Sequence, residues 1–136
     1  MSASQSVGVA VKPGNIQQLL FVLRGADLQS TADQAFTKSG SFTNYVPARL
    51  LCVCKTGGAI IACAGGIYTG AAKAGDQIVA VAQSWVTASA VGAAVDAAIA
   101  NLLTTKQSSA TPNLSLTTGS TAAATADFFI FGNIVD

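Results

Sequence analysis

Apolar residues occur in short runs along this chain, and turn residues separate one run from the next. The two longest are Leu50–Cys54 and Ala59–Ala64, with Lys55-Thr56-Gly57-Gly58 between them. Short runs of Ile, Val and Leu bounded by turn residues are typical of buried strands. Because glycine takes the positive φ that a tight turn needs, this stretch predicts a central β-hairpin whose second strand ends at Gly65-Gly66. Two glycines at that point indicate a bulge or the close approach of another backbone.

The remaining runs predict further strands of similar length. Turn residues such as Lys12-Pro13-Gly14-Asn15 separate them, and Gly25-Ala26-Asp27 is expected to close the second strand. Pro47 precedes the central hairpin and is compatible only with a strand start or a sheet edge. The expected strands outside the hairpin are Val7–Val11, Gln18–Arg24, Ala35–Thr37, Ile67–Thr69, Gln77–Trp85, Leu114–Thr117 and Asp127–Val135.

Residues 87–103 fit two patterns. One set of apolar positions has helical spacing and an overlapping set has strand spacing, and the alanine content favours a helix whereas the β context favours a strand. We expect a helical turn near 87–90 followed by a strand, and therefore at most one short helix near 87–100. About eight short antiparallel strands then predict an all-β fold, a β-sandwich or jelly roll. Residues 7–136 are expected to form this single domain, preceded by a flexible polar arm at residues 1–6.

Composition narrows the classes of partner. Of the 136 residues, 51% are hydrophobic and 10% are charged, against roughly 25% charged in ordinary soluble domains. Such low charge favours a protein buried in an assembly or one lying in a membrane. The segment Gln77–Val95 is uncharged and long enough to span, but its polar residues and its Ala and Val content make insertion marginal. We therefore expect no membrane partner, and the first twelve residues do not have the pattern of a signal peptide.

The basic residues are few and dispersed. The net charge is +1, and nucleic-acid binders instead concentrate Lys and Arg on one face, so we expect no nucleic-acid partner. The seven basic positions are Lys12, Arg24, Lys38, Arg49, Lys55, Lys73 and Lys106.

The three cysteines, Cys52, Cys54 and Cys63, are expected to be free residues of a sheet core. Cys52 and Cys54 are two positions apart, so on a strand they point to the same face and are poorly placed to bond to each other. A metal site would need more ligands, and the chain has no histidine to supply them. We expect no metal and no cofactor, and synthesis in a reducing cytoplasm.

The residue types also argue against catalysis. The chain has neither histidine nor glutamate, which removes the commonest general base and the Ser-His-Asp and Cys-His arrangements. A hydrolase based on paired aspartates would require two of them to converge, and most are interpreted instead as turn residues. Trp85, Tyr45 and Tyr68 are interpreted as core or interface residues in preference to a sugar site. We therefore expect that the protein is not an enzyme. The aspartates in question are Asp27, Asp33, Asp76, Asp96 and Asp127.

Three segments resemble a known class of protein: ADLQSTADQAF (Ala26–Phe36), CAGGIYTGAAKAGD (Cys63–Asp76) and LSLTTGSTAAATADFFIFG (Leu114–Gly132). The chain is similar in these motifs to small virion proteins of tailed bacteriophages, in particular to capsid decoration, or cement, proteins such as those of cyanobacterial phages. The run LLCVCKTGG departs from the resemblance, which implies a more polar strand end there.

The resemblance implies a β-sandwich or jelly roll that forms a homotrimer on the capsid surface of the virion. Its partner is then the major capsid protein, and its role is to stabilise capsomer junctions. The candidate contact with the capsid is the N-terminal arm, Ser2, Ala3, Ser4, Gln5 and Ser6. The alternative is a fibre-associated or receptor-binding virion protein whose exposed loops, such as Thr104–Asn113, contact host glycan.

Overall fold

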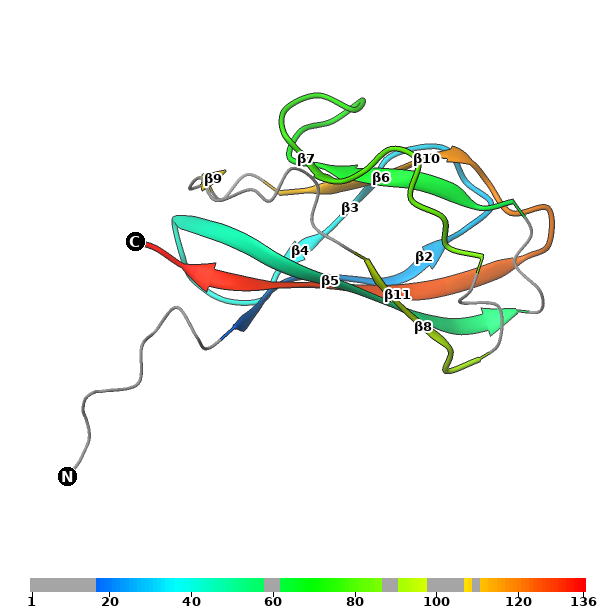
Figure 1. The fold of residues 1–136 in the computed structure, drawn as a ribbon, viewed down its shortest axis with the longest axis horizontal. Helices are drawn as coiled ribbons and strands as arrows, with labels where there is room; N and C mark the ends of the chain where they lie inside the picture. Colours follow the sequence, from blue (N-terminus) through cyan, green and yellow to red (C-terminus); the bar gives the residue numbers. More distant parts are fainter. Residues whose placement is uncertain (1–16, 58–61, 87–90, 98–106, 109–110) are drawn as a thin grey trace.

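Two antiparallel sheets stacked on each other make up the fold (Figure 1). The computed structural model describes residues 17–57, 62–86, 91–97, 107–108 and 111–136. Over these residues the structure contains strands, turns and loops but no helix. The prediction of an all-β sandwich is therefore confirmed.

The larger sheet has six strands and is built around the long strand β11 (Ala124–Ile134). β11 pairs with β2 (Gln18–Asp27) on one side and with β5 (Asn44–Gly57) on the other. The outer strands are β4 (Thr37–Lys38) beside β2, and β8 (Ala94–Ala97) and β9 (Gln107–Ser108) beside different parts of β5.

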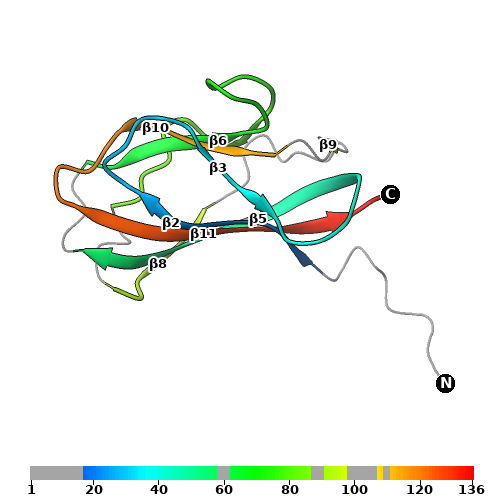
Figure 2. The same cartoon turned by 180° about the vertical axis from the view of Figure 1, so that it is seen from behind.

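The smaller sheet has four strands in the order β3, β10, β6 and β7. Their bounds are Gln34–Ala35, Asn113–Thr118, Ala64–Tyr68 and Gln77–Val79, respectively. Seen from behind, β10 and β6 form one layer, and β2, β11 and β5 form the other (Figure 2). The two layers enclose the core between them.

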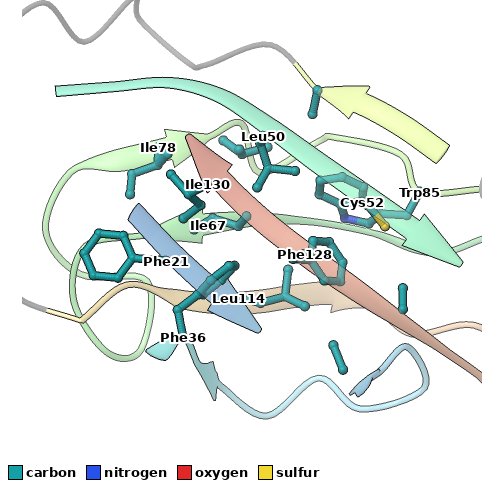
Figure 3. Packing of buried hydrophobic residues seen from close by; sticks show 14 of the residues in the cluster. Phe21, Phe36, Leu50, Cys52, Ile67, Ile78, Trp85, Leu114, Phe128 and Ile130 are labelled. Atoms are coloured by element: carbon teal, nitrogen blue, oxygen red, sulfur yellow. The ribbon is translucent and has the colours of Figure 1, made fainter. Parts of the chain in front are cut away.

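The core contains the large side chains that point inward from both sheets (Figure 3). Trp85 is fully buried, and its ring stands edge-on to Phe128 of β11 at a centroid distance of 5.1 Å. Phe128 also contacts Phe36 in a T-shaped arrangement. Tyr45 and Tyr68 are buried as well. Trp85, Tyr45 and Tyr68, which were predicted to be core or interface residues and not a sugar site, thus belong to the interior.

Several strand predictions are confirmed, although the strands are longer than expected. Gln18–Arg24 lies within β2, Leu114–Thr117 lies within β10, and most of Asp127–Val135 lies within β11. The three residues expected to close the first of these strands, Gly25-Ala26-Asp27, belong to β2 itself, which ends at Asp27. Gly25 has a φ of 62° beside a register shift, which lets the strand pass through an irregularity and continue.

The predicted central hairpin is wrong. Leu50–Cys54 lies in β5 of the larger sheet, whereas the described part of the second run contributes only Ala64 to a strand, β6 of the smaller sheet. Residues 58–61 lie outside the described part of the chain. β5 pairs instead with β11, whose partner residues lie between 67 and 89 positions further along the chain. Lys55, Thr56 and Gly57 of the predicted turn form the end of β5, and Gly57 has the expected positive φ of 106°.

Gly65 and Gly66 lie inside β6 instead of at a strand end, but the close approach that they indicated is confirmed. A Cβ on Gly65 would lie 2.4 Å from the Cα of Leu116, and one on Gly66 would lie 2.5 Å from the carbonyl oxygen of Val79. Both neighbours are backbone atoms of adjacent strands. Any side chain at either position would force the smaller sheet apart.

Three other local predictions need correction or fall outside the described residues. The expected strand Gln77–Trp85 is only Gln77–Val79, after which the chain turns and Ser84 forms an isolated bridge with Ala64. Pro47 lies within β5, opposite Gly132 at a register shift, and not before a strand. The helical turn at 87–90 and the strand Val7–Val11 lie outside the described part of the chain.

Candidate functional site

The side chains of β11 alternate between the core and the opposite side of the larger sheet. Phe128 and Ile130 are fully buried, whereas Phe129 and Phe131 are partly exposed. Because successive residues of a strand point to opposite faces, Phe129 and Phe131 lie on the face away from the core. Two phenylalanines on a face that the smaller sheet does not cover are the first sign of a functional surface.

Neighbouring strands extend this apolar surface. Leu51 and Val53 of β5 are partly exposed between fully buried neighbours, and Leu51 pairs directly with Phe129. On the other side of β11, Val22 of β2 pairs with the same Phe129. Facing residues in adjacent strands stand close enough for their side chains to contact. We call this surface the open face; its members are Leu19, Val22, Leu51, Val53, Phe129 and Phe131.

Two ion pairs flank the open face. Arg24 Nη1 lies 3.8 Å from Asp127 Oδ2, and its guanidinium lies 5.6 Å from the centre of the Phe129 ring. Arg49 Nη2 lies 3.0 Å from Asp96 Oδ2, and its guanidinium lies 5.8 Å from the centre of the Phe131 ring. Exposed ion pairs contribute little to folding stability. Their effect here is that the charges at the margins of the face are neutralised within the chain.

A shallow groove borders the open face at the edge formed by β2 and β4. Its volume is about 440 Å³, and its wall includes Val22 and Arg24. Two of its polar side chains bond within the protein: Lys38 Nζ donates to the carbonyl oxygen of Phe42 at 2.8 Å, and Ser39 Oγ donates to that of Leu20 at 3.1 Å. The groove therefore extends the open face as a mainly apolar depression.

The outer side of the smaller sheet is arranged differently, because the loop between β6 and β7 folds against it (Figure 1). Lys73 Nζ lies 2.9 Å from Oγ of the buried Ser115, and the backbone N–H of Ala72 donates to Asp33 Oδ2 at 2.6 Å. This backbone hydrogen bond, followed by one from Ser115 and the charge of Lys73, lowers the pKa of Asp33. Ala72 and Lys73 both have a positive φ, 55° and 61°. The contacts fasten the loop to the sheet.

The other side chains that the sequence singled out have structural positions. Cys52, Cys54 and Cys63 are free and buried, as expected, and Cys52 and Cys54 share the inward face of β5. Burial raises the pKa of Cys52 to about 12 and that of Cys63 to about 11. Among the described residues, no three His, Cys, Asp or Glu side chains are grouped so that they could bind a metal ion.

The aspartates hold backbone together at several points. Asp27 Oδ1 accepts a hydrogen bond from the N–H of Gln29, two positions along, which is the turn role expected of it. Asp127 instead accepts from the N–H of Gly25 in the neighbouring strand, and Asp33 accepts from Ala72 in a distant loop. The turn interpretation thus holds for Asp27 and is too narrow for Asp33, Asp96 and Asp127.

The candidate capsid-contact arm, residues 2–6, lies outside the described part of the chain, as does half of the loop 104–113. Gln107 of that loop is buried in β9 and Asn113 begins β10. In the described residues, no helix is long and apolar enough to cross a membrane.

The surface that the sequence interpretation missed is the open face. Its signal was present, because the runs containing Leu51, Val53, Phe129 and Phe131 are apolar at every position and do not alternate with polar residues.

A comparison of the chain with protein-family models, with curated proteins and with solved structures finds no match. The resemblance to capsid decoration proteins therefore depends on the three sequence segments alone.

Proposed function

We propose that this protein is a virion structural protein, a capsid decoration or cement protein that binds the head surface of a tailed phage and stabilises capsomer junctions. The proposal starts from the resemblance of the segments beginning at Ala26, Cys63 and Leu114 to such proteins. Its partners are then the major capsid protein and other copies of itself, most simply in a trimer. It has no catalytic role in this account.

The observation that carries the proposal is the open face. Leu51, Phe129 and Phe131 present apolar side chains on the outer side of the larger sheet, and the flanking arginines are paired with aspartates of the same chain. Contiguous apolar surface with a polar margin is typical of surfaces that associate with other proteins. A protein with such a surface and only 10% charged residues is suited to a repeated place in a lattice.

The mechanism is linkage. A protein that binds the mature shell more tightly than any other state of the shell stabilises that mature state by the difference in affinity. The arm formed by residues 2–6 is the proposed contact with the shell, since an extended chain reaches roughly 3.3 Å per residue across a junction. If the arm orders only on binding, the cost of ordering is met only when the partner is present.

The test is to determine where the protein lies in virions of the phage that encodes it. Labelled antibodies seen by electron microscopy should mark the head, at many copies per particle. Shells stripped of the protein should rupture at lower temperature, and adding the purified protein back should restore the original rupture temperature. Label confined to tails or fibres would overturn the proposal in favour of the receptor-binding alternative, and absence from virions would overturn both.

A further inference from the structure

The two central strands of the larger sheet are apolar on both sides. In β5 the consecutive residues Leu50, Leu51, Cys52 and Val53 alternate between the core and the open face, and all four are apolar. β11 has the same property from Phe128 to Phe131. Strands with one face in solvent alternate apolar and polar residues, whereas strands covered on both faces form continuous apolar runs. The sequence of these strands therefore has the pattern of a sheet covered on both sides.

The smaller sheet is covered on its outer side by another part of the same chain. Ser115 of β10 lies on its outer side and is 2% exposed, because the loop that carries Lys73 folds over it. On the larger sheet, Leu51, Val53, Phe129 and Phe131 remain partly exposed next to fully buried neighbours. The larger sheet is thus the layer whose outer face the described residues leave uncovered.

We propose that the open face binds a second copy of this chain. The two arginines beside the face are paired with Asp127 and Asp96, and Lys38 and Lys55 are the cations near it that make no ion pair with the described residues. An anionic polymer or an anionic lipid surface would need a larger cluster of unpaired cations there. A partner that is itself apolar and nearly neutral meets little unbalanced charge on this face, and another copy of a chain with net charge +1 satisfies that condition.

The size of the face corresponds to a weak contact. The row from β4 through β2, β11 and β5 to β8 contains five strands, of which β4 has two residues and β8 has four. Strands lie about 4.8 Å apart and rise about 3.4 Å per residue, so these short strands with about seven residues each of β2, β11 and β5 cover roughly 440 Å². Two copies in contact would then bury roughly 900 Å² in total, which is the size of a weak or transient protein interface.

The sheet edges are poor alternatives for contact between copies. The edge strand β4 has only two residues, and short edges give little backbone to pair with. At the far end of β2, the side-chain amide of Gln34 accepts from the N–H of Asp27 at 2.8 Å and donates to its carbonyl oxygen at 2.9 Å. These bonds occupy backbone groups that a second chain would use. Association through the face is therefore favoured over association through an edge.

Self-association through the open face would specify how copies of the protein contact one another in the proposed function. It rests on the proposed function only for where in the virion these copies lie. The purified protein tests it in the absence of shells. A failure of self-association would overturn the inference and leave head binding open, whereas absence from virions would overturn the proposed function and leave self-association intact.

The experiment is sedimentation of the full-length protein over a range of concentrations, with substitutions on the open face. We expect the wild-type chain, of mass 13.6 kDa, to associate at micromolar concentration. Leu51→Lys and Phe129→Lys should each weaken association at least about tenfold, and together at least about a hundredfold, because each places a charge in the apolar contact. The sedimenting mass also gives the number of copies: contact between the same face of two copies closes a dimer, whereas a trimer places this face against a different surface of the next copy.

A matched control places the same charge elsewhere. Val81 is 40% exposed and lies just after β7 of the smaller sheet, away from the open face, so Val81→Lys should leave association unchanged. Trp85 is the only tryptophan, and its buried position makes its emission a test of folding for every variant. If either lysine variant unfolds, Leu51→Thr and Phe129→Thr keep β-compatible side chains and test the same contact.

Three results would overturn the inference. The wild-type chain could remain a monomer at every concentration, or the face and control variants could associate equally well. Alternatively, the protein could bind neutral phosphatidylcholine vesicles as a monomer and lose this binding in the Leu51→Lys/Phe129→Lys variant, which would assign the face to a lipid surface.

Discussion

Phe128 and Phe129 are adjacent in β11 but lie on opposite sides of the sheet, so truncating each to alanine tests the assignment of the two faces. Phe128 is fully buried and makes T-shaped contacts with Trp85 and Phe36. Removing such a side chain leaves a cavity and lowers the free energy of unfolding by about 3–5 kcal/mol. Each of the two lost aromatic pairs contributes about 0.5–1.5 kcal/mol beyond the loss of buried area. Phe129 is partly exposed and covered in part by Arg24, so its truncation in the monomer should cost about 1 kcal/mol.

The assay is unfolding in urea followed by Trp85 emission. Measurements at several protein concentrations separate folding from association. A domain of this size has a total stability of about 5–15 kcal/mol, so Phe128→Ala should shift the midpoint strongly at every concentration. Phe129→Ala should have a small effect at low concentration and a larger one where the wild-type protein associates. Equal, concentration-independent losses for the two variants would refute the assignment of Phe129 to an uncovered face.

Four further results are expected. Gly65→Ala should prevent formation of the smaller sheet or cost several kcal/mol of stability, because its Cβ would lie 2.4 Å from a backbone carbon. Gly25→Ala should cost only about 1–2 kcal/mol, because this position lies in open space and only its φ of 62° opposes a side chain. Urea unfolding midpoints compare the two variants. The pKa of Cys52 is raised from 9.0 to about 12, first by burial and then by its neighbours Cys63, Cys54 and Asp127. The unfolded state therefore loses this proton at lower pH than the folded state, so the stability of the fold should decrease as pH rises from about 9 towards 12. Cys52→Ala should reduce this decrease when melting temperatures are measured over a series of pH values. Asp33→Asn should speed tryptic cleavage at Lys73 in timed digests with little change in melting temperature, because the carboxylate holds the loop at Ala72. Deleting residues 2–6 should leave the melting temperature nearly unchanged and weaken attachment to shells in co-sedimentation. If the deletion unfolds the domain, the arm is part of the sheet. If attachment is unchanged, the arm has no role in binding.

Local patterns were sufficient to predict several of the individual strands. The alternation in Leu114–Thr117 and the apolar run ending in Val135 both identified strands, since side-chain periodicity follows directly from backbone geometry. The pairing of strands is not a local property. Leu50–Cys54 and the run after it looked like a hairpin because a glycine turn separates them. Their actual partners are β11 and β10, which are far away in the sequence and are selected by the packing of the whole core.

The open face could have been predicted in part. The runs at Leu50–Cys54 and Asp127–Val135 predicted buried strands, and that interpretation is correct for the inward side of each. The sequence could not indicate that the described residues cover only one side of this sheet, because the cover of the other sheet comes from the loop around Lys73. The contacts of Arg24 and Arg49 with aspartates of other strands likewise depend on the register of the sheet.

The most direct test of the open face as a contact between copies is fluorine NMR of protein labelled with 4-fluorophenylalanine. The chain has six phenylalanines, and single substitutions assign their resonances. With increasing protein concentration, the resonances of Phe129 and Phe131 should shift and lose their sensitivity to exchange of H₂O for D₂O, while that of the buried Phe128 stays constant. Resonances of Phe129 and Phe131 that do not change from low micromolar to millimolar concentration would contradict the account.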